Sequence, residues 1–173
     1  MNFNQNFFEI FQLTPSFDLN LDELGERYQT LQRRVHPDRF VGQGAQAERL
    51  ATQWATQINE AYRTLSDGLS RAIYLLSMDS IELEENPTLS GAFLMEQIDL
   101  REDLEAAELS GEASVVLKFM NRLKNHMAEA EIRFQKAHTD GAFEEALQVV
   151  YRMQFLKKLM LSARAAEDKL LGY

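Results

Sequence analysis

Few side chains in this 173-residue sequence could perform chemistry, because it has no cysteine and three histidines. The absence of cysteine excludes disulfides, thiol catalysis and thiolate metal sites. His126 and His138 have no glutamate three residues before them, so neither fits the Glu-x-x-His metal motif of helical bundles, and both are expected at the surface or the rim of a core. Gly42-x-Gly44 lacks the strand–helix pattern of a phosphate-binding loop. We therefore expect no catalytic residue, metal or cofactor, although metal bound to the purified protein would revive an enzyme interpretation.

The third histidine belongs to the tripeptide His36-Pro37-Asp38, which is the strongest candidate for a functional site. Proline has no amide hydrogen and disfavours helical backbone angles at the residue before it, so a preceding helix must end here. His36 and Asp38 are then expected at an exposed tip, where the carboxylate of Asp38 can meet a basic group of a partner. Taken alone, the tripeptide would fit a plain helix end with a surface histidine.

Amphipathic helices are predicted on both sides of the tripeptide. Apolar residues recur every three or four positions over residues 21–35 and again over 45–66, as on one face of a helix. Asn20 and Glu23 have the spacing of a capping box at the start of the first of these helices. Shorter helices are predicted over residues 6–13 and 70–77. The apolar positions nearest the tripeptide are Leu24, Tyr28, Leu31 and Val35 before it, and Ala55, Ile58, Tyr62 and Leu65 after it.

The C-terminal part of the chain predicts a second domain built from longer helices. The acidic and polar stretch 77–87 is expected to connect the two domains. Short glycine-containing breaks separate the helices beyond it, so neighbouring helices run antiparallel. The sequence therefore predicts an all-α protein with an N-terminal helical-hairpin domain (1–76), the connection (77–87) and a C-terminal three-helix bundle (88–173). The bundle helices are expected over residues 89–109, 112–138 and 142–171.

The first bundle helix carries two apolar stripes where a small bundle needs one. Phe93, Leu100 and Leu104 follow a spacing that would face the bundle. The neighbouring stripe is built from Leu94, Met95 and Ile98, with a charged rim of Asp99, Arg101 and Glu102. This second stripe either widens the core, packs against the N-terminal domain, or forms a face that binds a partner.

The net charge of −9 argues against nucleic acid as the main partner, because phosphate binding needs basic clusters. Most of the acidic excess lies beyond residue 76, whereas basic residues gather near the tripeptide. These are Arg27, Arg33, Arg34 and Arg39. No apolar run approaches membrane-spanning length, and the first residues lack the features of a secretion signal, so we expect a cytoplasmic protein with no membrane partner.

The N-terminal part resembles the J-domain of J-protein co-chaperones. The resemblance rests on the tripeptide and its place between two helices, together with Phe8-x-x-Phe11, Tyr28-x-x-Leu31 and Ile58-x-x-Ala61-Tyr62-x-x-Leu65. It implies an antiparallel helical hairpin whose tip binds a DnaK-like chaperone. The residues expected to bind that chaperone are His36, Pro37, Asp38, Arg27, Arg33 and Arg34.

Over nearly its whole length the chain is similar to the HscB family of iron–sulfur cluster co-chaperones. The residues that carry this similarity are Arg71-Ala72-x-Tyr74-Leu75-Leu76, the run from Ala92 to Glu102, and Phe155-Leu156-x-Lys158-Leu159. The resemblance implies that the J-domain stimulates the ATPase of an HscA-type chaperone, and that the bundle binds an IscU-type cluster scaffold. It places scaffold binding at Leu94, Met95, Ile98, Asp99, Arg101, Glu102 and Phe155.

One departure from the family concerns the residue after the tripeptide, which is commonly lysine and is Arg39 here. Arginine and lysine are not equivalent donors, so the fine-tuning toward the chaperone can differ. The chain also lacks the N-terminal cysteine-bearing metal site of some eukaryotic members, which favours a bacterial-type protein. The alternative function is that of a general J-protein, whose acidic helical domain self-associates or binds unfolded clients.

Overall fold

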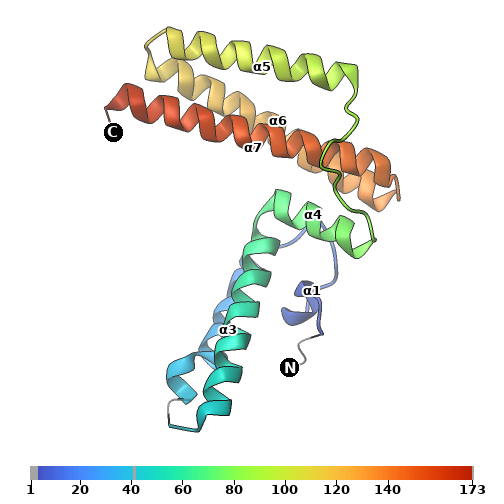
Figure 1. Cartoon of the computed structure of the whole chain (residues 1–173), viewed down its shortest axis with the longest axis vertical. Helices are drawn as coiled ribbons and strands as arrows, with labels where there is room; N and C mark the ends of the chain where they lie inside the picture. The colour runs from blue at the N-terminus through green and yellow to red at the C-terminus, as the bar shows by residue number, and fades with distance from the viewer. Residues whose placement is uncertain (1–3, 41, 173) are drawn as a thin grey trace. The chain divides into compact units, whose positions relative to one another are not determined.

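The computed structural model describes residues 4–40 and 42–172, and within these ranges it contains helices and no strand (Figure 1). The predicted all-α fold is confirmed. The chain divides into two compact units, Met1–Asp79 and Ser80–Tyr173. The N-terminal unit contains α1 (Phe7–Ile10), α2 (Leu21–Val35), the 3-10 turn η1 (Pro37–Phe40), α3 (Ala45–Ser66) and α4 (Gly68–Met78).

Helices α2 and α3 form the predicted hairpin, and both have the predicted bounds. Leu24 and Val35 of α2 are buried, as are Ile58 and Leu65 of α3, so the two apolar stripes face the core of this unit. The rings of Tyr28 and Tyr62 stack between the helices, with centroids 4.1 Å apart. The buried apolar residues of the unit are Phe8, Ile10, Phe11, Phe17, Leu24, Val35, Ala51, Ile58, Ala61, Leu65, Ala72, Leu75 and Leu76.

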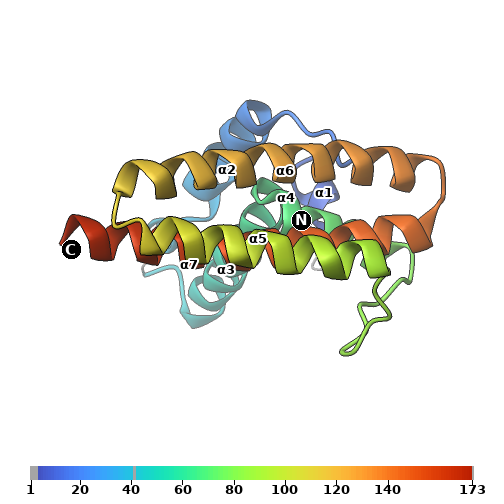
Figure 2. The same cartoon turned by 90° about the horizontal axis from the view of Figure 1, so that it is seen from above.

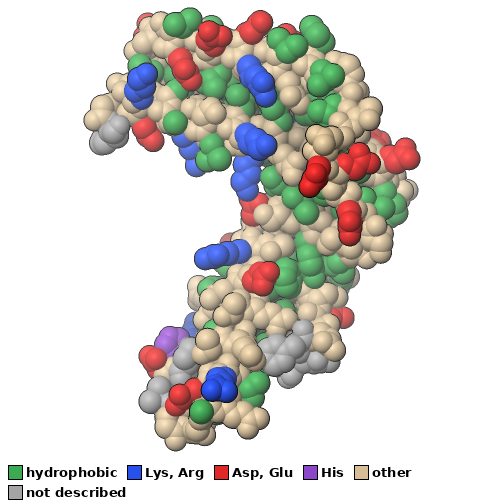
Figure 3. Space-filling view, in the orientation of Figure 1, with side chains coloured by type: hydrophobic (Ala, Val, Ile, Leu, Met, Phe, Trp, Pro, Cys, Tyr) green, Lys and Arg blue, Asp and Glu red, His purple; other side chains and the backbone are tan. Residues whose placement is uncertain are grey.

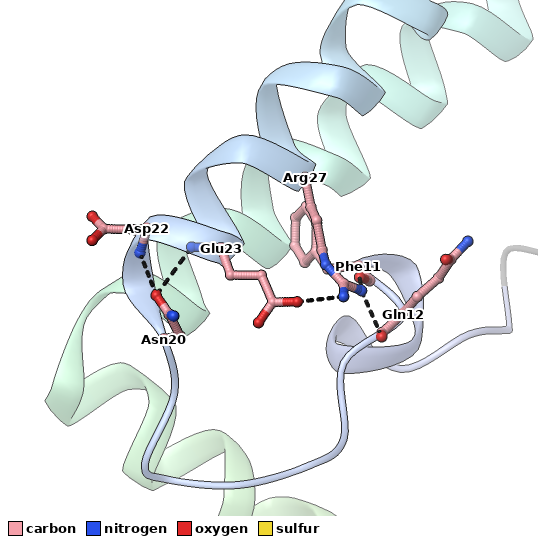
Figure 4. A network of polar contacts seen from close by, with 6 residues as sticks. All are labelled: Phe11, Gln12, Asn20, Asp22, Glu23 and Arg27. Atoms are coloured by element: carbon pink, nitrogen blue, oxygen red, sulfur yellow. Dashed lines mark hydrogen bonds and ion pairs between the residues drawn. The ribbon is translucent and has the colours of Figure 1, made fainter.

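The start of α2 is capped differently from the predicted capping box. The side-chain oxygen of Asn20 accepts hydrogen bonds from the amides of Asp22 and Glu23, both at 3.1 Å (Figure 4). The carboxylate of Glu23 turns instead toward Arg27, four residues further along the helix. The complete capping box lies at α1, where Asn6 and Glu9 each accept from the other's amide at 2.9 Å.

Helix α1 is shorter than the helix predicted over residues 6–13. Gln12 has a positive φ of 55°, the left-handed conformation that ends many helices. The amide of Leu13 reaches back to the carbonyl of Phe8 at 2.9 Å, and the amide of Gln12 donates to Glu9 at 3.0 Å, which together make a Schellman turn. The chain therefore reverses before Thr14 and Pro15. Phe8 and Phe11 still reach the core.

Helix α4 completes the N-terminal unit and carries its buried charge. Arg71 is 7% exposed, donates a hydrogen bond to the carbonyl of Leu65, and holds its guanidinium 4.8 Å from the centre of the Phe17 ring. The helix extends past the predicted end at residue 77, because the amide of Asp79 donates to the carbonyls of Leu75 and Leu76 and closes its last turn. Met78, predicted as part of the connection, is thus helical.

The C-terminal unit is the predicted three-helix bundle, formed by α5 (Gly91–Leu109), α6 (Ala113–Thr139) and α7 (Phe143–Leu171). Figures 1 and 2 show these helices lying alongside one another, with α6 antiparallel to both α5 and α7. Gly111 and Gly141 each have a φ of +70°, which lets the chain reverse within three residues. The bundle core contains Leu123, Phe134, Val150, Met153 and Leu156, all at most 1% exposed.

Two hydrogen bonds to α7 hold the later part of the segment between α4 and α5 against the bundle. The amide of Glu84 donates to the hydroxyl of Tyr151 at 2.8 Å, and the side-chain amide of Gln148 donates to the carbonyl of Thr88 at 3.0 Å. Ser90 then caps α5 by accepting from the amide of Phe93. None of the described helices is both long enough and apolar enough to cross a bilayer.

We predict that a fragment of residues 1–79 folds without the bundle, because Met1–Asp79 is a compact unit with its own set of buried apolar side chains. Circular dichroism should show a helical spectrum and a cooperative thermal transition. A fragment ending at residue 76 should melt at a lower temperature, because it loses the last turn of α4 and the Asp79 amide that closes it. A gradual, non-cooperative melt of the longer fragment would mean that the C-terminal unit completes this core.

Candidate functional site

The tripeptide lies where prediction places it, immediately after α2. His36 leaves the helix with φ −54° and ψ 125°, and Pro37 begins the 3-10 turn η1. The amide of Asp38 donates to Nδ1 of His36 at 3.3 Å, and an oxygen of its carboxylate lies 3.5 Å from the same nitrogen. The side chains of His36 and Asp38 are 54% and 84% exposed. The turn therefore presents a carboxylate to solvent from a backbone that is closed by hydrogen bonds.

Arg39 supports this turn through two hydrogen bonds. Its Nη1 donates to the carbonyl of Arg33 at 3.0 Å, and its own carbonyl accepts from the side chain of Gln43 at 2.7 Å. A helix leaves its last carbonyls without intrahelical donors, and a cation there also interacts favourably with the helix dipole. Arg39, the residue that departs from the common family pattern, thus caps the C-terminus of α2.

The three arginines of α2 that were predicted to bind a chaperone have different environments. Arg33 and Arg34 are exposed in the last turn of the helix, next to the tripeptide. Arg27 is half-buried, and its Nη1 donates to the carbonyls of Phe11 and Gln12, each at 2.6 Å. Its Nη2 binds the carboxylate of Glu23 at 2.5 Å. In Figure 4 this guanidinium points toward the end of α1, so Arg27 fastens α1 to α2.

The second apolar stripe of α5 lies on the surface. Leu94, Met95 and Ile98 are 47%, 58% and 49% exposed, whereas Phe93 and Leu100 of the first stripe are buried. The alternative that the second stripe widens the bundle core is therefore wrong. In Figure 3 hydrophobic side chains gather at the surface over the half of α5 nearer its N-terminus. The predicted rim residues Asp99, Arg101 and Glu102 are exposed as well.

Phe155 of α7 is half-buried and joins this surface through two contacts. Its ring meets the ring of Phe93 edge-on, with centroids 6.0 Å apart. The guanidinium carbon of Arg101 lies 5.6 Å from the centre of the Phe155 ring, within the range of a cation–π contact. The four apolar residues of the predicted scaffold-binding set are thus three exposed residues on α5 and a fourth, Phe155 on α7, that also packs against Phe93. We call these four residues, Leu94, Met95, Ile98 and Phe155, the apolar face.

The same two regions are recognised by comparison with protein families. A family model described as a DnaJ domain matches residues 6–74, and one described as the HSCB C-terminal oligomerisation domain matches residues 89–163. A co-chaperone protein HscB homolog from Burkholderia vietnamiensis is 35% identical over 168 residues, which are 94% of each chain. The chain belongs to the HscB family.

Solved structures agree with this assignment. The chaperone HscB from Vibrio cholerae superposes with a TM-score of 0.86 at 32% identity, covering 96% of this chain and 99% of the other. The human co-chaperone protein HscB gives a TM-score of 0.89 at 27% identity, over 95% of this chain and 83% of the human one. The protein is thus a J-domain co-chaperone, and its N-terminal unit is the J-domain.

The two remaining histidines of this HscB-family chain are partly buried at the rim of the bundle core, which is one of the two predicted placements. His138 stacks on Phe134, with centroids 5.6 Å apart, and meets Phe143 edge-on at 6.1 Å. His126 is 28% exposed and faces Arg152 and Glu96. Within residues 4–40 and 42–172 no three His, Asp or Glu side chains are grouped as metal ligands.

This contact between Glu96, His126 and Arg152 is the feature of the bundle that the sequence did not reveal. Each residue comes from a different helix, α5, α6 and α7, and no local spacing relates them. The only sequence signal is that each of the three polar residues lies three positions after one buried apolar residue and four positions before another.

We predict that Arg27→Ala lowers the free energy of unfolding by about 1–2 kcal/mol, because it leaves the Phe11 and Gln12 carbonyls without their charged donor. Urea titration followed by circular dichroism measures this. The matched controls Arg33→Ala and Arg34→Ala, at exposed positions of the same helix, should stay within about 0.5 kcal/mol of the parent. Equal stability of all three variants would show that Arg27 does not fasten α1.

Proposed function

We propose that this co-chaperone joins an HscA-type, DnaK-like chaperone to an IscU-type iron–sulfur cluster scaffold and stimulates the ATPase of the former. Its role is then the maturation of iron–sulfur proteins. The observation that carries the proposal is the apolar face, since exposed Leu, Met and Ile side chains on one turn of a helix are typical of a protein interface. The membership in the HscB family supports the choice of partners.

The J-domain end of the mechanism is electrostatic. Asp38 offers its exposed carboxylate to a basic group of the nucleotide-bound chaperone, while His36 and Pro37 fix the turn from which it extends. Arg33 and Arg34 add positive charge beside the turn in a protein of net charge −9, and they steer the encounter with an acidic patch. Arg27, a third candidate, would contribute mainly through the α1–α2 contact that it makes.

The bundle end of the mechanism is apolar. Leu94, Met95 and Ile98 insert between side chains of the scaffold, and the rim of Asp99, Arg101 and Glu102 adds charged contacts around them. Methionine suits such a surface, because its unbranched side chain adapts to the partner. Carrying both partners on one chain raises the effective concentration of scaffold at the chaperone.

The proposed compartment is the cytoplasm of a bacterium. The lack of cysteine fits a reducing compartment, and bacterial relatives support the assignment. A pull-down distinguishes the proposed function from the competing one, that of a general J-protein for unfolded clients. The full chain should retain the purified cluster scaffold and not an unfolded model protein.

Asp38→Asn is predicted to abolish stimulation of the chaperone ATPase, because the amide cannot pair with a cation as the carboxylate does. Steady-state ATPase assays with the HscA-type chaperone measure this, and circular dichroism and scaffold binding should be unchanged. Asp22→Asn is the matched control, since it removes an exposed carboxylate from the opposite end of α2. Full stimulation by the Asp38→Asn variant would refute the proposed role of the tripeptide.

Alanine substitutions at Leu94, Met95 and Ile98 are predicted to weaken scaffold binding by more than about tenfold each, because central apolar anchors contribute roughly 2 kcal/mol or more. Their melting temperatures should change little, since buried residues would instead cost about 2–5 kcal/mol. Phe155→Ala should lose both binding and some stability, because it also packs on Phe93. The control is Leu109→Ala, an 81% exposed leucine at the far end of α5. Lower melting temperatures with binding preserved would show that these residues serve the core.

A further inference from the structure

Helix α5 displays the larger part of the apolar face, yet few of its own side chains hold it to the bundle. Four of its 19 residues are buried, Phe93, Leu100, Leu104 and Ala107. In the half that carries Leu94, Met95 and Ile98, only Phe93 and Leu100 belong to this set. The apolar residues that could anchor this half point outward instead, so other contacts must fix its position against α6 and α7.

A charged contact provides such an anchor at the centre of this half. Nη2 of Arg152 on α7 lies 2.5 Å from Oε1 of Glu96 on α5 and 3.3 Å from Nδ1 of His126 on α6. A guanidinium can only donate, so Nδ1 of His126 accepts in this contact. The side chains of Glu96, Arg152 and His126 are 27%, 20% and 28% exposed. Partial burial reduces screening by water and salt, so this pair is stronger than one on the open surface.

The position of this contact along the helices relates it to the apolar face. Glu96 follows Met95 directly and lies one turn after Phe93, while Arg152 lies one turn before Phe155. The Glu96–Arg152 ion pair and the Phe93–Phe155 ring contact therefore join α5 to α7 at neighbouring turns. If the pair is lost, α5 can shift against α7, and the three exposed residues move relative to Phe155.

We infer that Glu96 and Arg152, supported by His126, are positioning residues that fix the first half of α5 on α7 and thereby align the apolar face for its partner. This inference rests on the proposed function of that face. The structure supplies a comparison, because a second ion pair, Asp103–Arg122, ties α5 to α6 two turns further on. Its side chains are 50% and 46% exposed, and it lies beyond the apolar face.

The test uses the full chain with Glu96→Gln, Arg152→Gln and both changes together, titrated with the purified IscU-type scaffold. Each single variant should weaken scaffold binding roughly fivefold. The affinity of the double variant should be no lower than that of the weaker-binding single variant, as expected for a coupled pair. Asp103→Asn should bind as the parent does. Binding unchanged in all variants with lower melting temperatures would reduce the pair to a structural role. Losses that multiply in the double variant would instead indicate two direct contacts with the scaffold.

A second measurement needs no partner and so separates this inference from the proposed function. Amides of residues 95–100 should exchange with deuterium faster in the Glu96→Gln variant than in the parent or in Asp103→Asn. Faster exchange combined with full scaffold binding by Leu94→Ala would overturn the proposed face and leave the anchoring intact. Unchanged exchange, with Leu94→Ala defective in binding, would overturn the anchoring alone.

Discussion

Pro37, which lacks an amide hydrogen and restricts the residue before it, is the constraint on which the proposed chaperone-binding end of the J-domain depends. Helix α2 cannot continue through this position, so it stops at Val35, and His36 takes a ψ of 125°. The stop leaves the last carbonyls of α2 open, and Arg39 donates to one of them while its amide donates to the carbonyl of His36 at 3.0 Å. The end of α2 and the exposure of Asp38 therefore have the same structural cause. A residue that allowed another turn of α2 would draw Asp38 into the helix and give the carbonyl of Arg33, which now accepts from Arg39, a donor within the helix.

In the bundle the corresponding constraint is a conflict between stability and display. Every apolar residue that α5 turns outward is one that cannot hold it to α6 and α7. Two contacts ease this conflict. The part-buried ion pair between Glu96 and Arg152 holds α5 to α7, and Phe155 packs against Phe93 while it also belongs to the apolar face. Such contacts are directional, so they fix the position of a helix more closely than apolar burial of the same size. A helix that must present a surface accurately gains from being anchored in this way.

The sequence predicted the elements better than the contacts between them. Residues 21–35 and 45–66 could be bounded because their apolar spacing is regular, and Asn20 and Pro37 also signal the two ends of the first of these helices. The end of α1 could not, since Gln12 adopts a positive φ that glycine would normally announce. Arg27 looked like one of a basic cluster because its partners are backbone carbonyls of Phe11 and Gln12, which leave no trace in residue type. The exposed stripe of α5 was visible in the sequence as a surplus of apolar residues. The contact between Glu96, His126 and Arg152 was not visible, because it joins residues of three different helices.

The two proposed interfaces of this HscB-family chain differ in the force that each would use, and the difference has a mechanistic consequence. The tripeptide region offers Asp38 with Arg33 and Arg34, all solvent-exposed, so its attraction acts at a distance and weakens as salt is added. The proposed apolar face would act at contact, through burial of Leu94, Met95 and Ile98 against a partner, and such an attraction would be nearly indifferent to salt. A chaperone recognised by charge and a scaffold recognised by apolar shape would not compete for one surface. Each partner could then be released without the other, as the proposed delivery of a scaffold to a chaperone requires.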